Sequence, residues 1–143
     1  MFSEKKINKY FELAKNAASF SDFHKQKIGS VIIYKNKVLS VGWNSQKEST
    51  LQKKYNQYTK RFDVDAYPNK IHAEMDALQK LRKKKDIEFS KCHIFIYRSS
   101  NNILRMARPC KACEKALRDL GIVNIHYTGN NSLVEEKYIG ELI

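Results

Sequence analysis

The stretch KIHAEMDAL, residues 70–78, decides how the rest of this sequence is interpreted. It places His72 and Glu74 two positions apart at the predicted start of a helix. Taken alone the pair is ambiguous, because a glutamate in a first helical turn is already favoured by the helix dipole. The pair indicates a functional site only if other reactive side chains lie close to it in the folded protein.

Such side chains occur in the later stretch RPCKACEKALRDLG, where Cys110 and Cys113 are three positions apart. A proline before the cysteines suits a first helical position and a glycine ends the run, so we predict a helix over 109–120. Both thiols then lie on one face of the first turn, at the positive end of the helix dipole, which favours the thiolate. A lone CxxC pair divides about evenly between metal binding and the alternatives of two small buried side chains or a redox pair.

The order His-x-Glu followed by Pro-Cys-x-x-Cys shifts that balance towards metal binding, because it is the signature of zinc deaminases. The chain resembles the zinc-dependent cytidine/deoxycytidylate deaminase superfamily, and within it the deoxycytidylate branch. In that branch two strands end in a Gly-aromatic-Asn turn, which is Gly42-Trp43-Asn44 here. Four stretches, a little over a third of the chain, carry the resemblance: IGSVIIYKNKVLSVGWNS, IHAEMDAL, CHIFIYRS and RPCKACEKALRDLGIVNIHYT.

The motif and the resemblance predict one Zn²⁺ per chain, held by His72, Cys110 and Cys113. Three protein ligands leave a fourth position for water, which is the pattern of a catalytic zinc site. The metal lowers the pKa of that water towards 7, and deamination also needs a group that moves protons. The resemblance assigns this role to Glu74. Because positions two apart on an ideal helix do not face each other, the pair must use an irregular first turn.

The resemblance also implies contacts with the substrate. Asn44 matches the family position that contacts the sugar, with a structural turn asparagine as the alternative, and Ala73 matches the alanine whose backbone approaches the base. Trp43 is either core or a pocket wall. The loop RSSNNILRMARP departs from the family pattern in its length and in placing Arg105 and Arg108 before the cysteines. Arginine forks match phosphate oxygens, so these residues are either a phosphate clamp or solvated surface.

A length of 143 residues predicts one domain over residues 1–143, and the resemblance implies that this is a single deaminase domain. No apolar run is long enough to span a membrane, and the amphipathic N-terminal stretch does not resemble a signal peptide. Two of the three cysteines belong to the metal site, so we expect a reducing, cytoplasmic setting without a disulfide framework. Cys92 opens an apolar run, and we expect a buried strand residue there rather than a fourth ligand.

The formal net charge is +12, and it is unevenly distributed. Residues 47–62 carry five basic groups against one acidic group, and residues 80–91 carry six against two. Residues 63–79, which hold the His-x-Glu pair, have a net charge of −3. Positive charge therefore flanks the predicted site in sequence. It is typical either of a solvated lysine surface or of attraction to an anionic nucleotide or nucleic acid.

Hydrophobic periodicity and turn residues predict the order α-β-β-α-β-α-β. This order predicts an α/β protein in which helices pack on a central mixed sheet, and the resemblance implies a three-layer α-β-α cytidine deaminase-like fold. Helices that join parallel strands start at the strands' carboxyl ends, so both motif helices should start at one edge of the sheet. The predicted elements are a helix over 3–19 capped by Ser3, a hairpin turning at Asn36, helices near 50–61 and over 71–84 and 109–120, strands over 92–98 and 122–128, and a last helix in the tail.

The leading functional interpretation is a hydrolase that deaminates a free cytosine nucleotide, in particular deoxycytidylate (dCMP). The alternative is a nucleic-acid-editing deaminase acting on cytosine or adenine in single-stranded DNA or RNA. It draws on four aromatic residues that interleave with basic residues and could stack bases: Tyr55, Tyr58, Phe62 and Tyr67. A non-catalytic zinc module is a third interpretation, and Glu74 argues against it because a structural zinc site needs no unligated carboxyl group. Family relatives are commonly oligomeric, which predicts a homo-oligomer.

Overall fold

The computed structural model describes residues 2–23, 26–58, 70–81 and 84–138. Its centre is one mixed sheet in the strand order β2-β1-β3-β5-β6, with β4 paired to β3. Of the pairings between these strands, β3 with β5 is parallel and the others are antiparallel. The strands are β1 (Lys27–Tyr34), β2 (Lys37–Trp43), β3 (His93–Ser100), β4 (Ile103–Leu104), β5 (Asn124–Gly129) and β6 (Ser132–Lys137).

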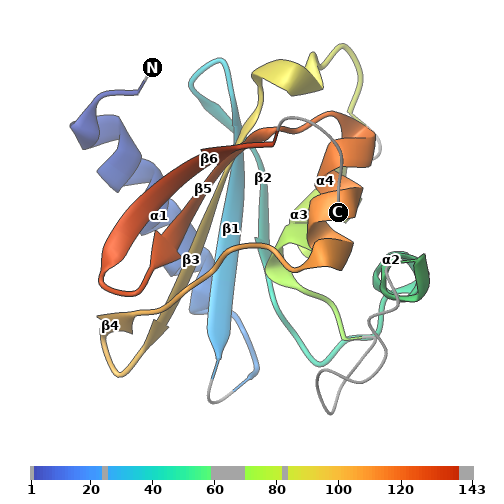
Figure 1. Ribbon diagram of the computed structural model, residues 1–143, viewed down its shortest axis with the longest axis horizontal. Coiled ribbons are helices and arrows are strands. Elements are labelled where there is room, and N and C mark those ends of the chain that lie inside the picture. The colour runs from blue at the N-terminus through green and yellow to red at the C-terminus, as the bar shows by residue number, and fades with distance from the viewer. Residues whose placement is uncertain (1, 24–25, 59–69, 82–83, 139–143) are drawn as a thin grey trace.

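Helices cover both faces of the sheet, as Figure 1 shows with the sheet seen nearly edge-on. α1 packs on β1 and β3 on one face, whereas α3 packs on β2 and β1 on the other face, beside α4 and α2. The helices are α1 (Glu4–Ala18), α2 (Thr50–Tyr58), α3 (Ala73–Leu81) and α4 (Lys111–Leu120), with a 3₁₀ turn at Phe89–Lys91. The arrangement confirms the predicted three-layer α/β fold with a mixed sheet.

Local sequence explains how the first elements begin and turn. The Oγ of Ser3 accepts a hydrogen bond from Lys6 N at 3.2 Å, which caps α1 as predicted. β1 and β2 form the predicted hairpin, with φ of 50° at Lys35 and 64° at Asn36. Two successive positive φ angles are typical of the tight turn whose twist matches that of the flanking strands.

Other predicted elements differ from the structure. The predicted tail helix is wrong over 132–137, where β6 pairs with β5 and forms an edge of the sheet. The predicted helix over 109–120 begins only at Lys111, because Cys110 has an extended backbone and caps it. Residues 71 and 72 precede α3 and residue 84 follows it outside the helix. Residues 59–61 and 82–83 of the predicted helices lie outside the described part of the chain.

Each face of the sheet carries its own apolar cluster, because alternate residues of β3 point to opposite faces. Phe95 belongs to an aromatic cluster beneath α1, whereas Ile94 and Ile96 belong to the larger cluster beneath α3 and α4. His126 is buried in the α1 face, stacked on Phe95 with ring centroids 4.1 Å apart, and its Nε2 lies 2.9 Å from His93 Nδ1. Among the described residues, no helix is long and apolar enough to cross a bilayer.

Candidate metal centre

α3 is anchored to the sheet at its first two turns. The hydroxyl of Ser30 donates to the carbonyl of Ala73 at 2.9 Å, and that of Ser40 donates to the carbonyl of Ala77 at 2.7 Å. Gly42 lies directly beneath the same helix, since a Cβ at this position would overlap backbone atoms of Ala73 and Ala77. Two directed hydrogen bonds and a close approach therefore fix the helix start that carries the predicted histidine ligand.

α4 presents the two cysteines in its first turn. Cys110 is the N-cap, and its carbonyl accepts from Glu114 N at 2.8 Å. Cys113 is the third helical residue, so both thiols lie on the same face of the helix start. Gly121 ends the helix with φ of 102°, a left-handed conformation that glycine adopts without strain. Pro109 precedes the N-cap, where its fixed φ limits the backbone leading into the ligand pair.

The predicted ligands lie together although they are far apart in sequence. His72 Nδ1 is 3.7 Å from Cys110 Sγ and 3.5 Å from Cys113 Sγ. Zinc bonds of about 2.0–2.1 Å to nitrogen and 2.3 Å to sulfur, at tetrahedral angles, would separate these atoms by roughly 3.6 Å. The three donors therefore fit a zinc ion. They are the sole group of this kind within the described residues, and Cys92, buried just before β3, does not belong to it.

The pKa values of the two thiols of the centre are shifted in opposite directions. A hydrogen bond with Cys113 and the neighbouring His72 lower the pKa of Cys110 below its ordinary value. The same hydrogen bond with Cys110, together with burial, raises the pKa of Cys113. The two buried thiols therefore do not both ionise readily, and a proton stays with the pair in the absence of metal. A divalent cation displaces that proton when it binds, so metal affinity falls as the pH falls.

The carboxyl group of Glu74 lies beside the ligands. Burial raises its pKa, and the nearby charge of His72 and a hydrogen bond with Cys113 act in the opposite direction. The side chain is 5% exposed. Side chains two positions apart within a helix point in different directions, but His72 precedes α3 and is not itself a helical residue, so this restriction does not apply to His72 and Glu74. His72 therefore lies at the start of α3 and Glu74 in its first turn.

Two residues that are predicted to contact the substrate already have hydrogen-bond partners within the protein. The Oδ1 of Asn44 accepts from Ile28 N at 2.9 Å, and its Nδ2 donates to Gln26 O at 2.7 Å. This matches the alternative of a structural turn asparagine, although each atom retains capacity for one further hydrogen bond. Ala73 is fully buried and its carbonyl is occupied by Ser30.

Trp43 lies at the edge of the sheet formed by β2. Its ring contacts Phe20, with centroids 5.1 Å apart, and the ammonium group of Lys80 lies 4.0 Å above it. Lys80 also donates to the carbonyl of Val41 at 2.8 Å. Trp43 is therefore a half-buried residue of an edge strand, and its ring packs between Phe20 and Lys80.

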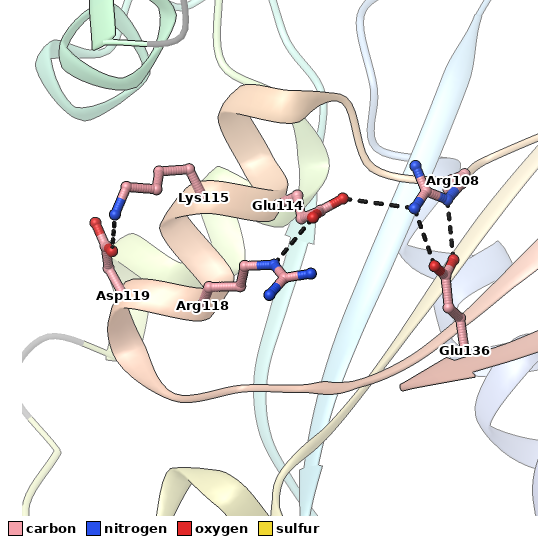
Figure 2. A network of polar contacts seen from close by, with 6 residues as sticks. All are labelled: Arg108, Glu114, Lys115, Arg118, Asp119 and Glu136. Atoms are coloured by element: carbon pink, nitrogen blue, oxygen red, sulfur yellow. Dashed lines mark hydrogen bonds and ion pairs between the residues drawn. The ribbon is translucent and has the colours of Figure 1, made fainter. Parts of the chain in front are cut away.

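The two arginines of the long loop differ in their surroundings. Arg108 donates through Nε and Nη2 to both carboxylate oxygens of Glu136 at 2.9 Å, and its Nη2 lies 3.5 Å from Glu114 (Figure 2). Glu114 is in turn bound by Arg118 at 2.9 Å. Arg105 is exposed and has no ion pair within the described residues. Arg108 is therefore already neutralised by carboxylates, whereas Arg105 is available to an anion.

Sequence reasoning missed one residue that contacts the centre. The backbone N–H of His72 donates to Oε1 of Gln52 at 3.0 Å, although the two residues belong to different elements. In the sequence Gln52 is one polar residue of a polar insertion, and no spacing rule connects it with a residue 20 positions later. Only its complete burial in the structure distinguishes it.

Comparison with known families and structures agrees with this geometry. The family model described as "cytidine and deoxycytidylate deaminase zinc-binding region" matches residues 4–128. No curated protein matches the chain.

Solved structures share the fold at low sequence identity. The dCMP deaminase of the cyanophage S-TIM5, in complex with dCMP and dUMP, is 18% identical with a TM-score of 0.64, covering 89% of this chain and 83% of that one. A cytidine deaminase from Burkholderia pseudomallei is 16% identical with a TM-score of 0.62, covering 95% and 93%. With the family match over most of its length, this chain belongs to the zinc-binding cytidine and deoxycytidylate deaminases, hydrolytic enzymes that act on cytosine nucleosides or nucleotides.

Proposed function

We propose that the substrate is a cytosine mononucleotide, dCMP, which is converted to the uracil nucleotide with release of ammonia. The observation that carries this choice is the exposed guanidinium of Arg105 in the loop that leads to Cys110. The backbone of this residue is anchored, because its N donates to Arg98 O at 2.9 Å and its O accepts from Thr128 Oγ1 at 2.7 Å. A cation on an anchored loop, with no ion pair to the described part of the chain, suits one phosphate group.

The catalytic role proposed for Glu74 follows from its position and its raised pKa. Zinc held by the three ligands would supply a Lewis acid that lowers the pKa of water. The Glu74 carboxylate takes a proton from the attacking water and delivers it to the ring nitrogen beside the reacting carbon. It then takes the remaining proton of the added hydroxyl group and passes it to the amino group, which leaves as ammonia while the carbonyl of the uracil ring forms. Burial makes the Glu74 carboxyl group hold a proton more readily than an exposed glutamate does, which suits a group that accepts a proton and passes it on.

The editing alternative loses part of its support in the structure. Tyr55 is buried at 8% exposure, and its hydroxyl donates to Asp119 at 2.9 Å, so its ring is not available to stack on a base. Tyr58 is 67% exposed, with Lys115 5.1 Å from its ring centroid. Phe62 and Tyr67 lie outside the described residues. Of the two residues that the structure describes, only Tyr58 is therefore exposed enough to stack on a base.

The substrate is tested by incubating the zinc form with dCMP, CMP, deoxycytidine, cytidine and cytosine-bearing oligonucleotides, with ammonia release as the readout. dCMP should be deaminated most efficiently, roughly ten- to a hundred-fold better than deoxycytidine, because a charge-assisted contact with phosphate is worth about 1.5–3 kcal/mol. Ammonia release from an oligonucleotide without release from any mononucleotide would overturn the proposal in favour of the editing enzyme.

The phosphate contact is tested by two arginine variants. Arg105→Ala should reduce the preference for dCMP over deoxycytidine and leave the rate with deoxycytidine nearly unchanged. Arg108→Ala is the matched control, because its guanidinium is engaged by Glu136 and Glu114. It should lower stability and affect both substrates alike. If Arg108→Ala alone removes the preference, Arg108 rather than Arg105 binds the phosphate.

A further inference from the structure

The insertion between β2 and α3 forms a bridge between the two helices that carry the metal site. Ser49, just before α2, donates through its hydroxyl to Gln79 Oε1 of α3 at 2.8 Å. Tyr55 of α2 donates through its hydroxyl to Asp119 Oδ2 of α4 at 2.9 Å. α2 therefore links the helix that follows the histidine to the helix that carries the cysteines.

A third contact from α2 reaches a ligand residue itself. His72 is at the N-cap position of α3, because its carbonyl accepts from Asp76 N at 3.0 Å. In a capping box, a Glu or Gln at the third helical position accepts the N–H of the N-cap residue. That position is Met75 here, which offers no such oxygen. Gln52 supplies it from another helix, since its Oε1 accepts from His72 N at 3.0 Å.

The amide of Gln52 has a defined orientation. The side chain is fully buried, and its Nε2 donates to Asn56 Oδ1 at 2.9 Å. The reverse orientation would point the amide NH₂ at the N–H of His72, so that two donors would face each other without an acceptor. With no exposure at Gln52, water cannot easily replace the missing acceptor. The contact therefore has one favourable arrangement, and that arrangement holds the backbone of a ligand residue.

We propose that Gln52 is a positioning residue for the zinc centre. By holding the His72 backbone, it keeps the imidazole Nδ1 within reach of the sulfur atoms of Cys110 and Cys113. This inference rests on the proposed assignment of His72 as a zinc ligand, and it does not depend on the identity of the substrate. Hydrogen-bonding groups behind metal ligands commonly change metal affinity by about 10–100-fold when they are replaced. Gln52 acts on the main chain of the ligand rather than on its ring.

The first test replaces Gln52 by methionine, which has a similar volume and no amide oxygen. Zinc affinity is measured by competition with a chelator, and ligand geometry by the visible absorption spectrum of the Co²⁺-substituted protein. Gln52→Met should bind zinc about 10–100-fold more weakly than the parent and should change the cobalt spectrum. Gln52→Asn keeps the amide but withdraws it by one methylene. It should weaken zinc binding in the same direction even if the methionine variant does not fold.

Two further variants separate positioning from a general loss of stability. Gln52→Glu provides the rescue, because a protonated carboxyl group offers one acceptor for His72 N and one donor for Asn56. It should restore the cobalt spectrum and most of the zinc affinity at mildly acidic pH, compared with the parent at the same pH. Tyr55→Phe removes the contact of α2 with Asp119. It should lower the melting temperature and leave zinc affinity unchanged.

The inference fails if Gln52→Met or Gln52→Asn binds zinc as tightly as the parent. It also fails if Tyr55→Phe weakens zinc binding as much as the Gln52 variants do, because the effect would then be one of general stability. A His72→Ala variant distinguishes this failure from failure of the ligand assignment. Loss of zinc in His72→Ala with normal zinc in Gln52→Met removes only the role of Gln52. Full zinc in His72→Ala removes the ligand assignment, and the role of Gln52 with it.

Discussion

The two faces of the sheet hold their helices by different means. On one face, α1 is held by aromatic packing: the rings of Tyr10 and Phe11 each lie with centroids 5.2 Å from that of Phe95. On the other face, α3 packs on the larger apolar cluster and is held in addition by directed hydrogen bonds of 2.9 and 2.7 Å from two strand serines to its carbonyl groups. Apolar packing is non-directional, whereas a hydrogen bond depends on distance and angle. The directed contacts are thus on the face that must place a metal ligand and a carboxyl group.

The largest expected effect lies on the α3 and α4 face, where the ligands are. His72→Ala, Cys110→Ser and Cys113→Ser should each lose the single zinc ion and abolish activity, because three protein ligands are the minimum of a catalytic zinc site. Elemental analysis of the purified variants measures the metal. Cys92→Ala is the matched control and should keep full zinc, since Cys92 is buried away from the cluster. A full complement of zinc in Cys110→Ser would show that the ligand set is wrong.

The second largest effect is expected for Glu74, whose proposed role is proton transfer rather than metal binding. Glu74→Gln should keep zinc and substrate binding but lose turnover by roughly 10²–10⁴-fold, because a positioned acid/base contributes about that much to a rate. Steady-state kinetics with zinc quantified in the same samples gives the measurement. Activity within a few-fold of the parent would mean that another group moves the protons.

A matched pair of glycine variants compares the two faces directly. A Cβ at Gly29 would overlap backbone atoms of Ala14 and Ala18 in α1, and a Cβ at Gly42 would overlap those of Ala73 and Ala77 in α3. Each alanine variant should therefore lower the free energy of unfolding by roughly 1–3 kcal/mol or more through overpacking.

Only one of these variants should affect the metal. Gly42→Ala displaces the start of α3 and should weaken zinc binding, whereas Gly29→Ala displaces α1 and should leave zinc affinity unchanged. Denaturant unfolding and chelator competition measure the two quantities separately. Equal losses of zinc affinity in both variants would show that the faces are mechanically coupled.

The smallest expected effect is a pH dependence that belongs to the α1 face. Burial, and then the neighbouring His93, lower the pKa of His126 from 6.5 to about 4. Glu135, opposite His126 on β6, is the charged group that favours protonation of His93. Between about pH 4 and pH 6.5, the imidazole of His126 is protonated in the unfolded chain and neutral in the folded chain. Stability is therefore complete above about pH 6.5 and should fall by about 2 kcal/mol on lowering the pH to 5.

The control for this prediction is His126→Gln, which keeps a hydrogen-bonding group next to His93 but does not titrate. Free energies of unfolding are measured for both proteins at pH 5 and pH 7.5 with chelator present, so that zinc release does not contribute. The pH-dependent loss should be smaller in the variant than in the parent. Equal losses in the two proteins would place the titrating group elsewhere.

Several features were predictable from sequence because they depend on neighbours along the chain. The Ser3 cap, the positive φ of Asn36 and the glycine end of α4 each follow from the conformational preference of one residue in a local context. The tail was wrongly predicted as a helix, because six residues with four charged or polar side chains carry a weak periodicity. Pairing with β5 decides their conformation, and strand pairing is a long-range property.

The chemistry predicted for the centre follows from residue types and their spacing along the chain. His72, Cys110 and Cys113 have the residue types and spacing of zinc ligands, and a spacing within one helix turn already places two of them on one face. The packing of separate elements, in contrast, sets which polar side chains already have hydrogen-bond partners elsewhere in the protein. Arg108 is engaged by Glu136, and Gln52 accepts the His72 N–H, through contacts between residues 28 and 20 positions apart. A hydrogen bond needs its atoms within about 3 Å, and that proximity depends on how separate elements pack rather than on any local pattern.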